Sequence, residues 1–513
     1  MTPSRKSPTK KSLLFCLVLC FIGFPVCSQE WTLHYQEGYP DGRTHFHDGW
    51  VDREGVAFLA GEEGPDYRHP HTLLLRIAPD GTHRAFHYTR PGCHTKATCL
   101  VETPDGHLFA VGNCYGTEHD SLLLLLFDKE LNLLVERTYG KDPSFGPFGD
   151  CKALCDPHGH LIVCTSMTQD NGFGGTEDRG VFFRFDAQGV LLHQHELTAV
   201  FPDPLFYLMD FHPRQLWYRP ENETLLVLAP ASGGVPSFIT FDTAFNYLEE
   251  HPIWREEDDM SDHTLFRDAY TDYWYSDDEA LFFSSRGDAD HNKLRISRIN
   301  TQGEYQAFIR LHERPDTIDD AARHRCMAAA DDSTFYFGFH THTTGYYPGI
   351  AGVYRINGRL EITGRHLDDD HDRYRSWMVL PTHDGGCLTV NDSCAWSGTA
   401  DLGHPVIRKL RPEDFESVPW TVVSTDNGTY PLGGPPPKHA YPNPAETLLY
   451  LPLTGQPTRC QVFDSQGRIV CDRHIDGSGD ALQLNVSGLR PGWYLYRLFE
   501  DGHLLLQEKF LKQ

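Results

Sequence analysis

The chain has 513 residues, of which 45 are Lys or Arg and 71 are Asp or Glu, so its formal net charge is -26. A protein this acidic gains little from counterion release on nucleic acid and is repelled by anionic lipid, which excludes nucleic-acid-binding and lipid-surface-binding functions. Its length is too great for one compact core and indicates at least two folded units.

The first 28 residues have the features of a signal peptide. Basic side chains precede an apolar run from Ser12 to Phe24, and Val26 and Ser28 occupy the -3 and -1 positions of a cleavage site before Gln29. A lipoprotein signal is the competing interpretation because a cysteine follows the run, but the residue before that cysteine is Val26, where a lipobox requires a small side chain. We predict cleavage after Ser28 and export.

The remaining sequence contains no second membrane segment. The apolar run of the signal peptide is too short for a stable anchor, and no later stretch approaches eighteen consecutive apolar residues. Fourteen cysteines are present, and eleven of them follow the signal peptide, so at least one is free or bonded between chains. Matched CxxC pairs are missing, which argues against a zinc ribbon.

A repeat extends over most of the mature chain. Seven apolar runs each end in a turn, and their last apolar residues are spaced by 50 to 58 positions: Ile77, Phe127, Phe185, Phe241, Ile299, Ile356 and Leu410. Two further strand-like segments with an Asp-, Pro- and Gly-rich turn precede each run, and a fourth usually follows it. We therefore predict an all-β chain with a seven-bladed β-propeller at residues 29–424. The blades are expected near 49–88, 95–140, 148–197, 206–254, 267–311, 316–367 and 373–424.

Closure of the ring leaves two alternatives. The last outer strand is supplied either by residues 31–36 (WTLHYQ) or by residues 420–424 (WTVVS). We favour the N-terminal segment, because it would join the first and last blades and leave no strand edge exposed.

One face of the propeller is the predicted binding face. The loops between the second and third strands of the blades are long and rich in His, Asp and aromatic residues, and they share a face with the connections between blades. The binding-face candidates on these loops are Tyr115, Glu118, His119, Asp170, Glu177, Asp178, Asp288, Asp290, His340, His342, Tyr346 and Trp396.

Catalytic and metal-binding patterns are weak. The sequence has no GxSxG, HExxH, Walker, GxGxxG or sialidase Asp-box motif. Histidines alternate in three places, His45 with His47, His69 with His71 and His340 with His342. None of these pairs has a third ligand at a spacing typical of a metal site. We predict no cofactor, and a structural divalent cation is the alternative. No catalytic residue is identified, and a glycosidase would need only two suitably spaced carboxylates on this face.

A second unit follows a Pro- and Gly-rich linker at residues 425–439. Residues 440–513 form a short series of strand-like segments, which predicts a small immunoglobulin-like β-sandwich. The segment CQVFDSQGRIVC is expected to form a hairpin around Ser465 and Gln466. That register places Cys460 directly opposite Cys471, a geometry that permits a disulfide.

Residues 440–513 resemble the type A C-terminal sorting domain of the type IX secretion system of Bacteroidetes. The matching positions, in family order, are Tyr441, Pro442, Asn443, Pro444, Ala445, Phe463, Asp464, Gly467, Arg468, Leu489, Gly492, Tyr494, Lys509 and Lys512. The resemblance implies recognition by the type IX machinery, transfer across the outer membrane, and release from the cell or attachment to its surface.

Together these patterns predict a secreted or cell-surface propeller that binds an extracellular glycan or protein. The alternative is a secreted hydrolase of polymers such as glycans, with acidic residues of the long-loop face as acid and base. The sorting domain does not distinguish the two functions.

Overall fold

The structure is a computed structural model that divides into two compact units, Met1–Asn427 and Gly428–Gln513. It describes residues 30–37, 43–65, 69–116, 120–140, 149–170, 176–197, 211–230, 236–252, 270–275, 280–286, 294–300, 305–311, 317–322, 324–331, 334–343, 350–358, 360–368, 374–394, 403–416, 448–452, 458–464, 468–475, 481–500 and 503–512. The predicted signal peptide, the second closure segment and the linker lie outside these ranges.

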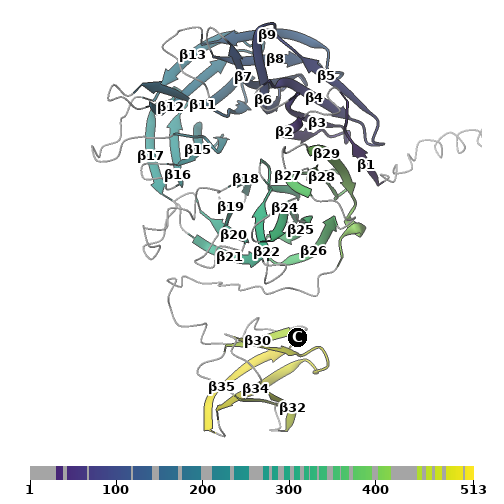
Figure 1. Ribbon diagram of the computed structural model, residues 1–513. Coiled ribbons are helices and arrows are strands. Elements are labelled where there is room, and N and C mark those ends of the chain that lie inside the picture. The colour runs from purple at the N-terminus through teal and green to yellow at the C-terminus, as the bar shows by residue number, and fades with distance from the viewer. Residues whose placement is uncertain are drawn as a thin grey trace, which may run out of the picture. The chain divides into compact units, whose positions relative to one another are not determined.

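The described part of the first unit consists of antiparallel sheets arranged around a common axis, which confirms the predicted all-β propeller (Figure 1). Blades 1 to 4 contain the strands β2 (Arg43–Val51), β3 (Ala57–Gly64), β4 (His71–Ile77), β5 (His83–Tyr88), β6 (Cys93–Glu102), β7 (Leu108–Gly116), β8 (Ser121–Phe127), β9 (Leu133–Tyr139), β10 (Lys152–Cys155), β11 (Leu161–Asp170), β12 (Thr176–Phe185), β13 (Leu191–Glu196), β14 (Gln215–Arg219), β15 (Thr224–Pro230), β16 (Pro236–Asp242) and β17 (Tyr247–Pro252).

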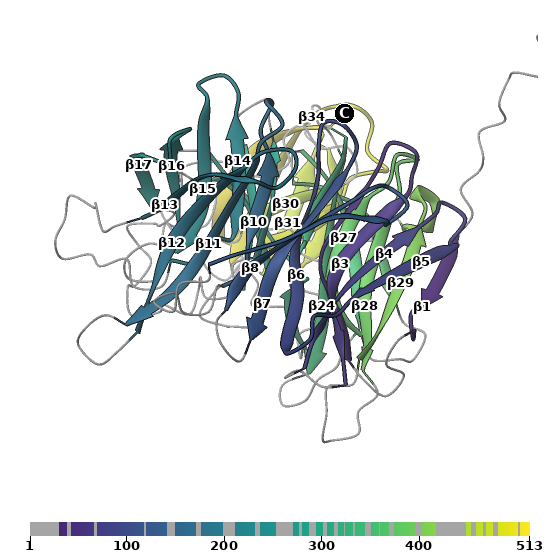
Figure 2. The ribbon, with the colours of Figure 1, turned by 90° about the horizontal axis from the view of Figure 1, so that it is seen from above.

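Blades 5 to 7 complete the circle seen in Figure 1. Their strands are β18 (Tyr270–Tyr275), β19 (Ala280–Arg286), β20 (Leu294–Ile299), β21 (Tyr305–Leu311), β22 (Thr317–Ala321), β23 (Met327–Asp331), β24 (Thr334–Thr343), β25 (Ala351–Asn357), β26 (Ile362–Asp368), β27 (Tyr374–Pro381), β28 (Cys387–Cys394) and β29 (Gly403–Leu410), followed by the 3-10 helix η3 (Pro412–Asp414). A sideways view shows the blade strands running along the axis (Figure 2).

The strand β1 (Trp31–His34) closes the ring. It pairs with β29 as the outer strand of blade 7, from Trp31 opposite Lys409 to His34 opposite Val406, which confirms the favoured N-terminal closure. The Trp31 indole Nε1 donates a hydrogen bond to the carbonyl oxygen of Pro79 in blade 1, at 3.0 Å. Tyr35 is buried in the core between blades 7 and 1. One short segment therefore binds the two ends of the ring together.

The cores lie between neighbouring blades, and this explains the strand sequences. The middle strand β8 (SLLLLLF) is buried at every position, because both of its faces pack against a neighbouring blade. Such a strand needs apolar residues throughout, whereas the outer strand β9 has exposed leucines at Leu133 and Leu134. Within each repeat, the distribution of apolar residues therefore reflects the position of each strand between the axis and the outer edge of the blade.

Several of the described blade turns share one hydrogen-bond pattern. In blade 1, Asp52 Oδ1 accepts from the amides of Glu54 and Val56, and Gly55 has a left-handed φ of 82°. Asp156 and Gly159 repeat the arrangement in blade 3. An acceptor side chain at the first position and a residue that tolerates positive φ at the fourth are what this turn requires, as the sequence predicted.

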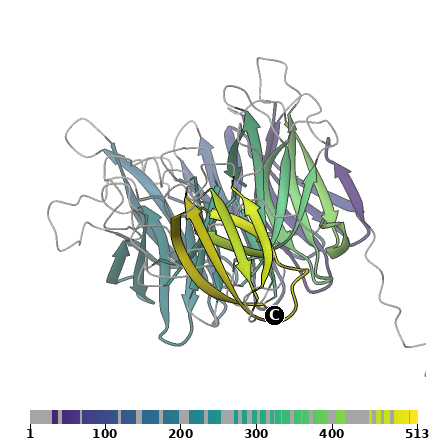
Figure 3. The same ribbon diagram turned by 90° about the horizontal axis from the view of Figure 1, so that it is seen from below.

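The described residues of the C-terminal unit form two sheets, a pair of strands, β30 (Leu448–Pro452) and β33 (Ala481–Asn485), and a four-stranded sheet. The second sheet contains β31 (Arg459–Phe463), β32 (Ile469–His474), β34 (Gly492–Glu500) and β35 (His503–Lys512), and Figure 3 shows its strands side by side in yellow. Leu449, Leu451, Tyr496 and Phe510 are buried in one core shared by the two sheets, as in the predicted small sandwich.

The predicted hairpin register is wrong by two residues. Cys471 lies opposite Val462, and Cys460 lies opposite Arg473, so the two cysteines are diagonal neighbours with free thiols. The reason is the turn, in which Asp464 accepts a hydrogen bond from the amide of Arg468 and the pairing is irregular between Val462 and Phe463. The Cys460–Cys471 disulfide is therefore not formed in this structure.

Candidate functional site

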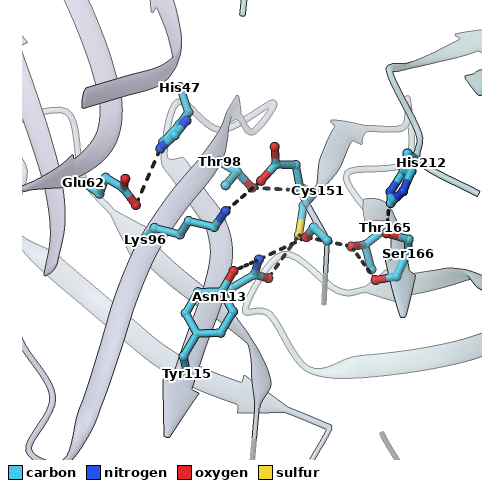
Figure 4. Close-up of polar contacts among 12 residues, drawn as sticks. His47, Glu62, Lys96, Thr98, Asn113, Tyr115, Cys151, Thr165, Ser166 and His212 are labelled. Carbon is cyan, nitrogen blue, oxygen red and sulfur yellow. Dashed lines mark hydrogen bonds and ion pairs between the residues drawn. The ribbon is translucent and has the colours of Figure 1, made fainter. Parts of the chain in front are cut away.

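A cluster of polar side chains lies where the first strands of blades 1 to 3 meet. The first strands contact one another in sequence around the axis, β2 with β6, β6 with β10, and β10 with β14, and β27 of blade 7 contacts β2. We define the inner-strand cluster as His47, Glu62, Lys96, Thr98, Asn113, Tyr115, Asp150, Cys151, Thr165, Ser166 and His212. Figure 4 labels all of these except Asp150, which belongs to the cluster through its ion pair with Lys96.

Bulges in the first strands place part of this cluster. In β2 the pairing skips His47, in β6 it skips Thr98, and in β27 it skips Trp377. A bulge re-aims a side chain that regular alternation would turn toward a neighbouring blade. The same local feature thus recurs at one level of the propeller in three blades.

Glycines on the second strands make room for two of these bulges. A Cβ on Gly61 would lie 1.9 Å from the carbonyl oxygen of His45, and a Cβ on Gly112 would lie 1.9 Å from that of Lys96. Both contacts are with backbone, which cannot move aside as a flexible side chain can, so only glycine fits at these positions.

Lys96 and Asp150 form the ion pair of the cluster. Lys96 Nζ lies 2.8 Å from Asp150 Oδ1 and 5.9 Å from the centre of the Tyr115 ring. The Asp150 side chain is 59 % exposed and that of Lys96 19 %, so the carboxylate reaches solvent although blade residues surround it. Burial would raise the pKa of Asp150, but the charges of Lys96 and nearby histidines outweigh it and hold the pKa well below the ordinary range.

Hydrogen bonds anchor the segment that carries Asp150. The Asn113 side-chain amide donates to the Tyr115 hydroxyl and to the Gly149 carbonyl oxygen, each at 3.0 Å. The Cys151 amide donates to Thr98 Oγ1 at 3.1 Å. Because the donors and acceptors come from blades 2 and 3, these bonds fix the position of Asp150 relative to Lys96.

Histidines and an arginine join this region to blades 6 and 7. His47 Nδ1 lies 3.3 Å from His324 Nε2, and His47 Nε2 lies 3.8 Å from Glu62 Oε2. The His324 ring stacks on Trp377 with centroids 5.1 Å apart. Arg325 Nε lies 2.8 Å from the buried Asp48 of blade 1. The region is therefore built from several blades rather than from one loop.

The protonation states restrict the chemistry. Burial opposes ionisation of Glu62, but the contact with His47 and the charge of Lys96 lower its pKa overall. Burial raises the pKa of Tyr115, and it raises the pKa of Cys151 to about 11. At neutral pH the cluster therefore has two charged carboxylates, a neutral phenol and a neutral thiol, which can bind polar groups but include no ready carboxylic acid or thiolate. The described residues hold no group of three His, Cys, Asp or Glu arranged for a metal ion.

The structure brings one predicted binding-face residue, Tyr115, into the cluster. His340 is 2 % exposed and lies within β24, opposite Asp320. His342 is also in β24, Asp170 is in β11, and Glu177 and Asp178 are in β12, so these four residues lie in strands where loops were expected. The side chains of these four residues are not described. Outside the described residues lie Glu118, His119, Asp288, Asp290, Tyr346 and Trp396.

The sequence interpretation missed Lys96, Asp150, Asn113 and Glu62. Glu62 and Asn113 are in β3 and β7, near the ends that lead into the long loops, whereas Lys96 is in β6 and Asp150 precedes β10. The available signal was the glycine before a polar stretch on two second strands, in GEEG at Gly61 and in GNCYG at Gly112. Such a glycine indicates a close backbone approach, which here is the bulge that accompanies the cluster.

Comparisons with known proteins identify the C-terminal unit. Residues 439–513 match the family described as the secretion system C-terminal sorting domain, in agreement with the predicted type IX domain. Of the sorting-motif residues, Tyr441 to Ala445 and Gly467 lie outside the described ranges, whereas Gly492 and Tyr494 are in β34 and Lys509 and Lys512 in β35. The chain is thus a secreted or cell-surface protein that interacts with the type IX secretion machinery.

The other comparisons found only distant similarity. No curated protein sequence matches the chain. Among solved structures, a Dyadobacter fermentans protein of unknown function has 11 % identity and a TM-score of 0.41, covering 63 % of this chain and 96 % of its own. The extracellular domain of a putative one-component system from B. thetaiotaomicron has 11 % identity and a TM-score of 0.42, covering 95 % and 58 %. The polysaccharide lyase Uly1 has 11 % identity and a TM-score of 0.42, covering 72 % and 90 %. The described residues contain no helix with the length and hydropathy of a membrane span.

Proposed function

We propose that this exported protein is a binding protein whose inner-strand cluster holds a polyhydroxylated ligand, such as a unit of an extracellular glycan. The observation that carries the proposal is the charged, solvent-exposed Asp150 carboxylate, which lies 2.8 Å from Lys96 Nζ, while Lys96 Nζ lies over the Tyr115 ring. A carboxylate fixed in this way presents free lone pairs to a ligand without having to be ordered when the ligand binds.

The charges of the cluster favour a neutral ligand rich in hydroxyl groups. Lys96 is paired with Asp150 and the nearby Arg325 with Asp48, while the charged Glu62 faces His47, so the cluster has no excess positive charge that would bind an anionic ligand. Hydroxyl groups both donate and accept hydrogen bonds, and they suit an exposed carboxylate beside an ammonium group. A few convergent polar groups next to an aromatic ring are common in sites for small polar ligands.

The same protonation states favour binding over hydrolysis. A glycosidase needs one carboxylic acid whose raised pKa keeps it protonated until it donates to the leaving group. Both carboxylates of the cluster have lowered pKa values instead. We therefore favour a binding protein over the alternative of a glycan-active hydrolase.

Delivery of the site to the cell exterior is part of the proposal. The predicted signal peptide, residues 1–28, would take the chain across the inner membrane of a Bacteroidetes cell, and the sorting domain would then direct it through the type IX system. Cleavage after Ser28 would yield Gln29 as the first residue of the mature protein.

A glycan array followed by calorimetry, with sugar release monitored in parallel, tests the ligand proposal on the full chain. For a ligand found on the array, Asp150→Asn should weaken binding by about 10- to 100-fold, as expected for loss of a hydrogen bond to a charged group. The matched control is Glu130→Gln, an exposed carboxylate that is 61 % accessible and lies 3.3 Å from Arg76. Equal binding by Asp150→Asn and the wild type would contradict the site, and sugar release by the wild type would favour the hydrolase.

A further inference from the structure

We propose that Cys93 and Cys114 form a disulfide that joins β6 and β7 once the protein has left the reducing cytoplasm. In the structure both thiols are free. Cys93 lies opposite Gly116 and Cys114 lies opposite Thr95, so the two cysteines are diagonal neighbours on the same face of the sheet. Both pack in the apolar cluster between blades 1 and 2.

Glycine opposite Cys93 gives this pair the freedom to bond. Gly116 has no side chain, so nothing on the facing position keeps the Cys93 side chain from leaning toward Cys114. The two thiols also interact: burial raises the pKa of Cys114 to about 11, and a hydrogen bond that the Cys114 thiol donates to Cys93 contributes to the rise. Closing such a contact to the S–S length of about 2.05 Å requires side-chain rotation at the first residue of a strand.

The C-terminal unit offers an internal comparison. Cys460 and Cys471 have the same diagonal relation, but the residues that face them are Arg473 and Val462, both of which have bulky side chains. Burial is the largest cause of the raised pKa of each thiol, and the charge of Cys471 raises that of Cys460 further. The facing residues are therefore the geometric difference between the two pairs: a glycine faces Cys93, whereas side chains face both cysteines of the C-terminal hairpin.

The exposure of the two thiols determines which of them reacts first with an oxidant. Cys93 is partly exposed and Cys114 is 2 % exposed. The Cys93 thiolate attacks a disulfide of an external oxidant, which forms a mixed disulfide and releases one oxidant thiolate. Cys114 then loses its proton and attacks Cys93 Sγ, which releases the second oxidant thiolate. The protein loses two electrons and two protons in total, and the oxidant disulfide is reduced to two thiols.

The bond would lie next to the inner-strand cluster. Lys96 is three residues after Cys93 on β6, and Asn113 and Tyr115 flank Cys114 on β7. A covalent link between these strand ends would hold the ammonium group and its amide and phenol neighbours at a fixed separation. The inference itself rests only on the two cysteines and does not depend on the identity of the ligand.

Peptide mapping of the exported full chain tests the proposal. The protein is denatured in iodoacetamide without reductant and then digested. We expect one linked peptide pair that contains Cys93 and Cys114 and disappears after treatment with dithiothreitol, whereas Cys460 and Cys471 are both alkylated. Alkylation of Cys93 and Cys114, or linkage of either to another cysteine, would overturn the proposal.

Thermal unfolding supplies a second readout. Dithiothreitol should lower the Tm of the wild type by a few degrees, because it frees a closed loop of about 20 residues in the unfolded chain. The Cys93→Ser variant should show a lower Tm that dithiothreitol does not change. An equal dithiothreitol-induced fall in both proteins would mean that this bond is not the source of the effect.

Discussion

At the scale of single residues, Asp150 combines solvent exposure with a strong preference for the charged form. The preference comes from Lys96 at 2.8 Å and from neighbouring histidines, which outweigh the opposing effect of burial. A carboxylate whose pKa is lower in the folded protein than in the unfolded chain stabilises the fold at pH values above its unfolded pKa. That contribution is lost as the pH falls toward the folded pKa.

The corresponding prediction concerns Asp150→Asn. At pH 7 the variant should have a lower Tm than the wild type, because Lys96 loses its partner. The difference should persist down to about pH 4, near the ordinary pKa of aspartate, and shrink below it as the wild-type carboxylate is protonated. Calorimetric Tm values between about pH 3 and pH 7 measure this. A difference that stays constant over the whole range would contradict the lowered pKa.

The sequence predicted one residue of the inner-strand cluster, Tyr115, but not its neighbours Lys96 and Asp150. Loop composition directs attention to residues such as Glu118 and His119, whereas Lys96 and Asp150 lie on neighbouring blades, 54 positions apart in the sequence. Only the packing of blade 2 against blade 3 brings these residues together. The predicted register of the hairpin that contains Cys460 was wrong for a related reason. One irregular pair next to the turn shifts the register of every residue beyond it.

At the scale of elements, the four-residue strand β1 connects the first and last blades. Trp31 pairs with blade 7, donates a hydrogen bond to Pro79 of blade 1, and covers Gly81, where a Cβ would lie 3.0 Å from the nearest atom of the indole ring. Each blade otherwise obtains its described strands from one continuous stretch of chain. Closure by a distant segment converts an open array into a ring without a free edge between the first and last blades.

We expect Trp31→Ala to destabilise the propeller by about 2 kcal/mol, because a half-buried indole and its hydrogen bond are lost. Thr32→Ala is the matched control, since Thr32 is exposed on the same strand and its replacement should cost less than about 0.5 kcal/mol. Urea unfolding followed by tryptophan fluorescence and circular dichroism compares them. Equal midpoints for the two variants would show that the strand closes the ring without the help of Trp31.

At the scale of the whole molecule, the propeller and the sorting domain that directs secretion are separate units. The contacts of the chain divide between Asn427 and Gly428, and the sorting-domain match begins at residue 439. The described strands of the propeller pair only with one another, and β1 rather than a C-terminal segment closes it. The propeller should therefore fold when the sorting domain is absent.

Deletion of residues 439–513 is expected to leave a folded propeller in the periplasm, because the type IX machinery then has nothing to recognise. Cell fractionation and protease treatment of intact cells measure the location, and circular dichroism of the purified truncated protein measures the fold. Surface exposure of the truncated protein would contradict the assignment of delivery to this domain. The full chain processed in parallel is the control.

The sequence by itself determined the repeat, the all-β class and the sorting domain. These depend on apolar periodicity, turn residues and a local motif, all of which are properties of neighbouring positions such as Asp52 and Gly55. The tertiary structure decided the register of the C-terminal hairpin and the composition of the inner-strand cluster. Lys96, Asp150 and His324 come from different blades that converge at the axis, and no local pattern encodes that convergence.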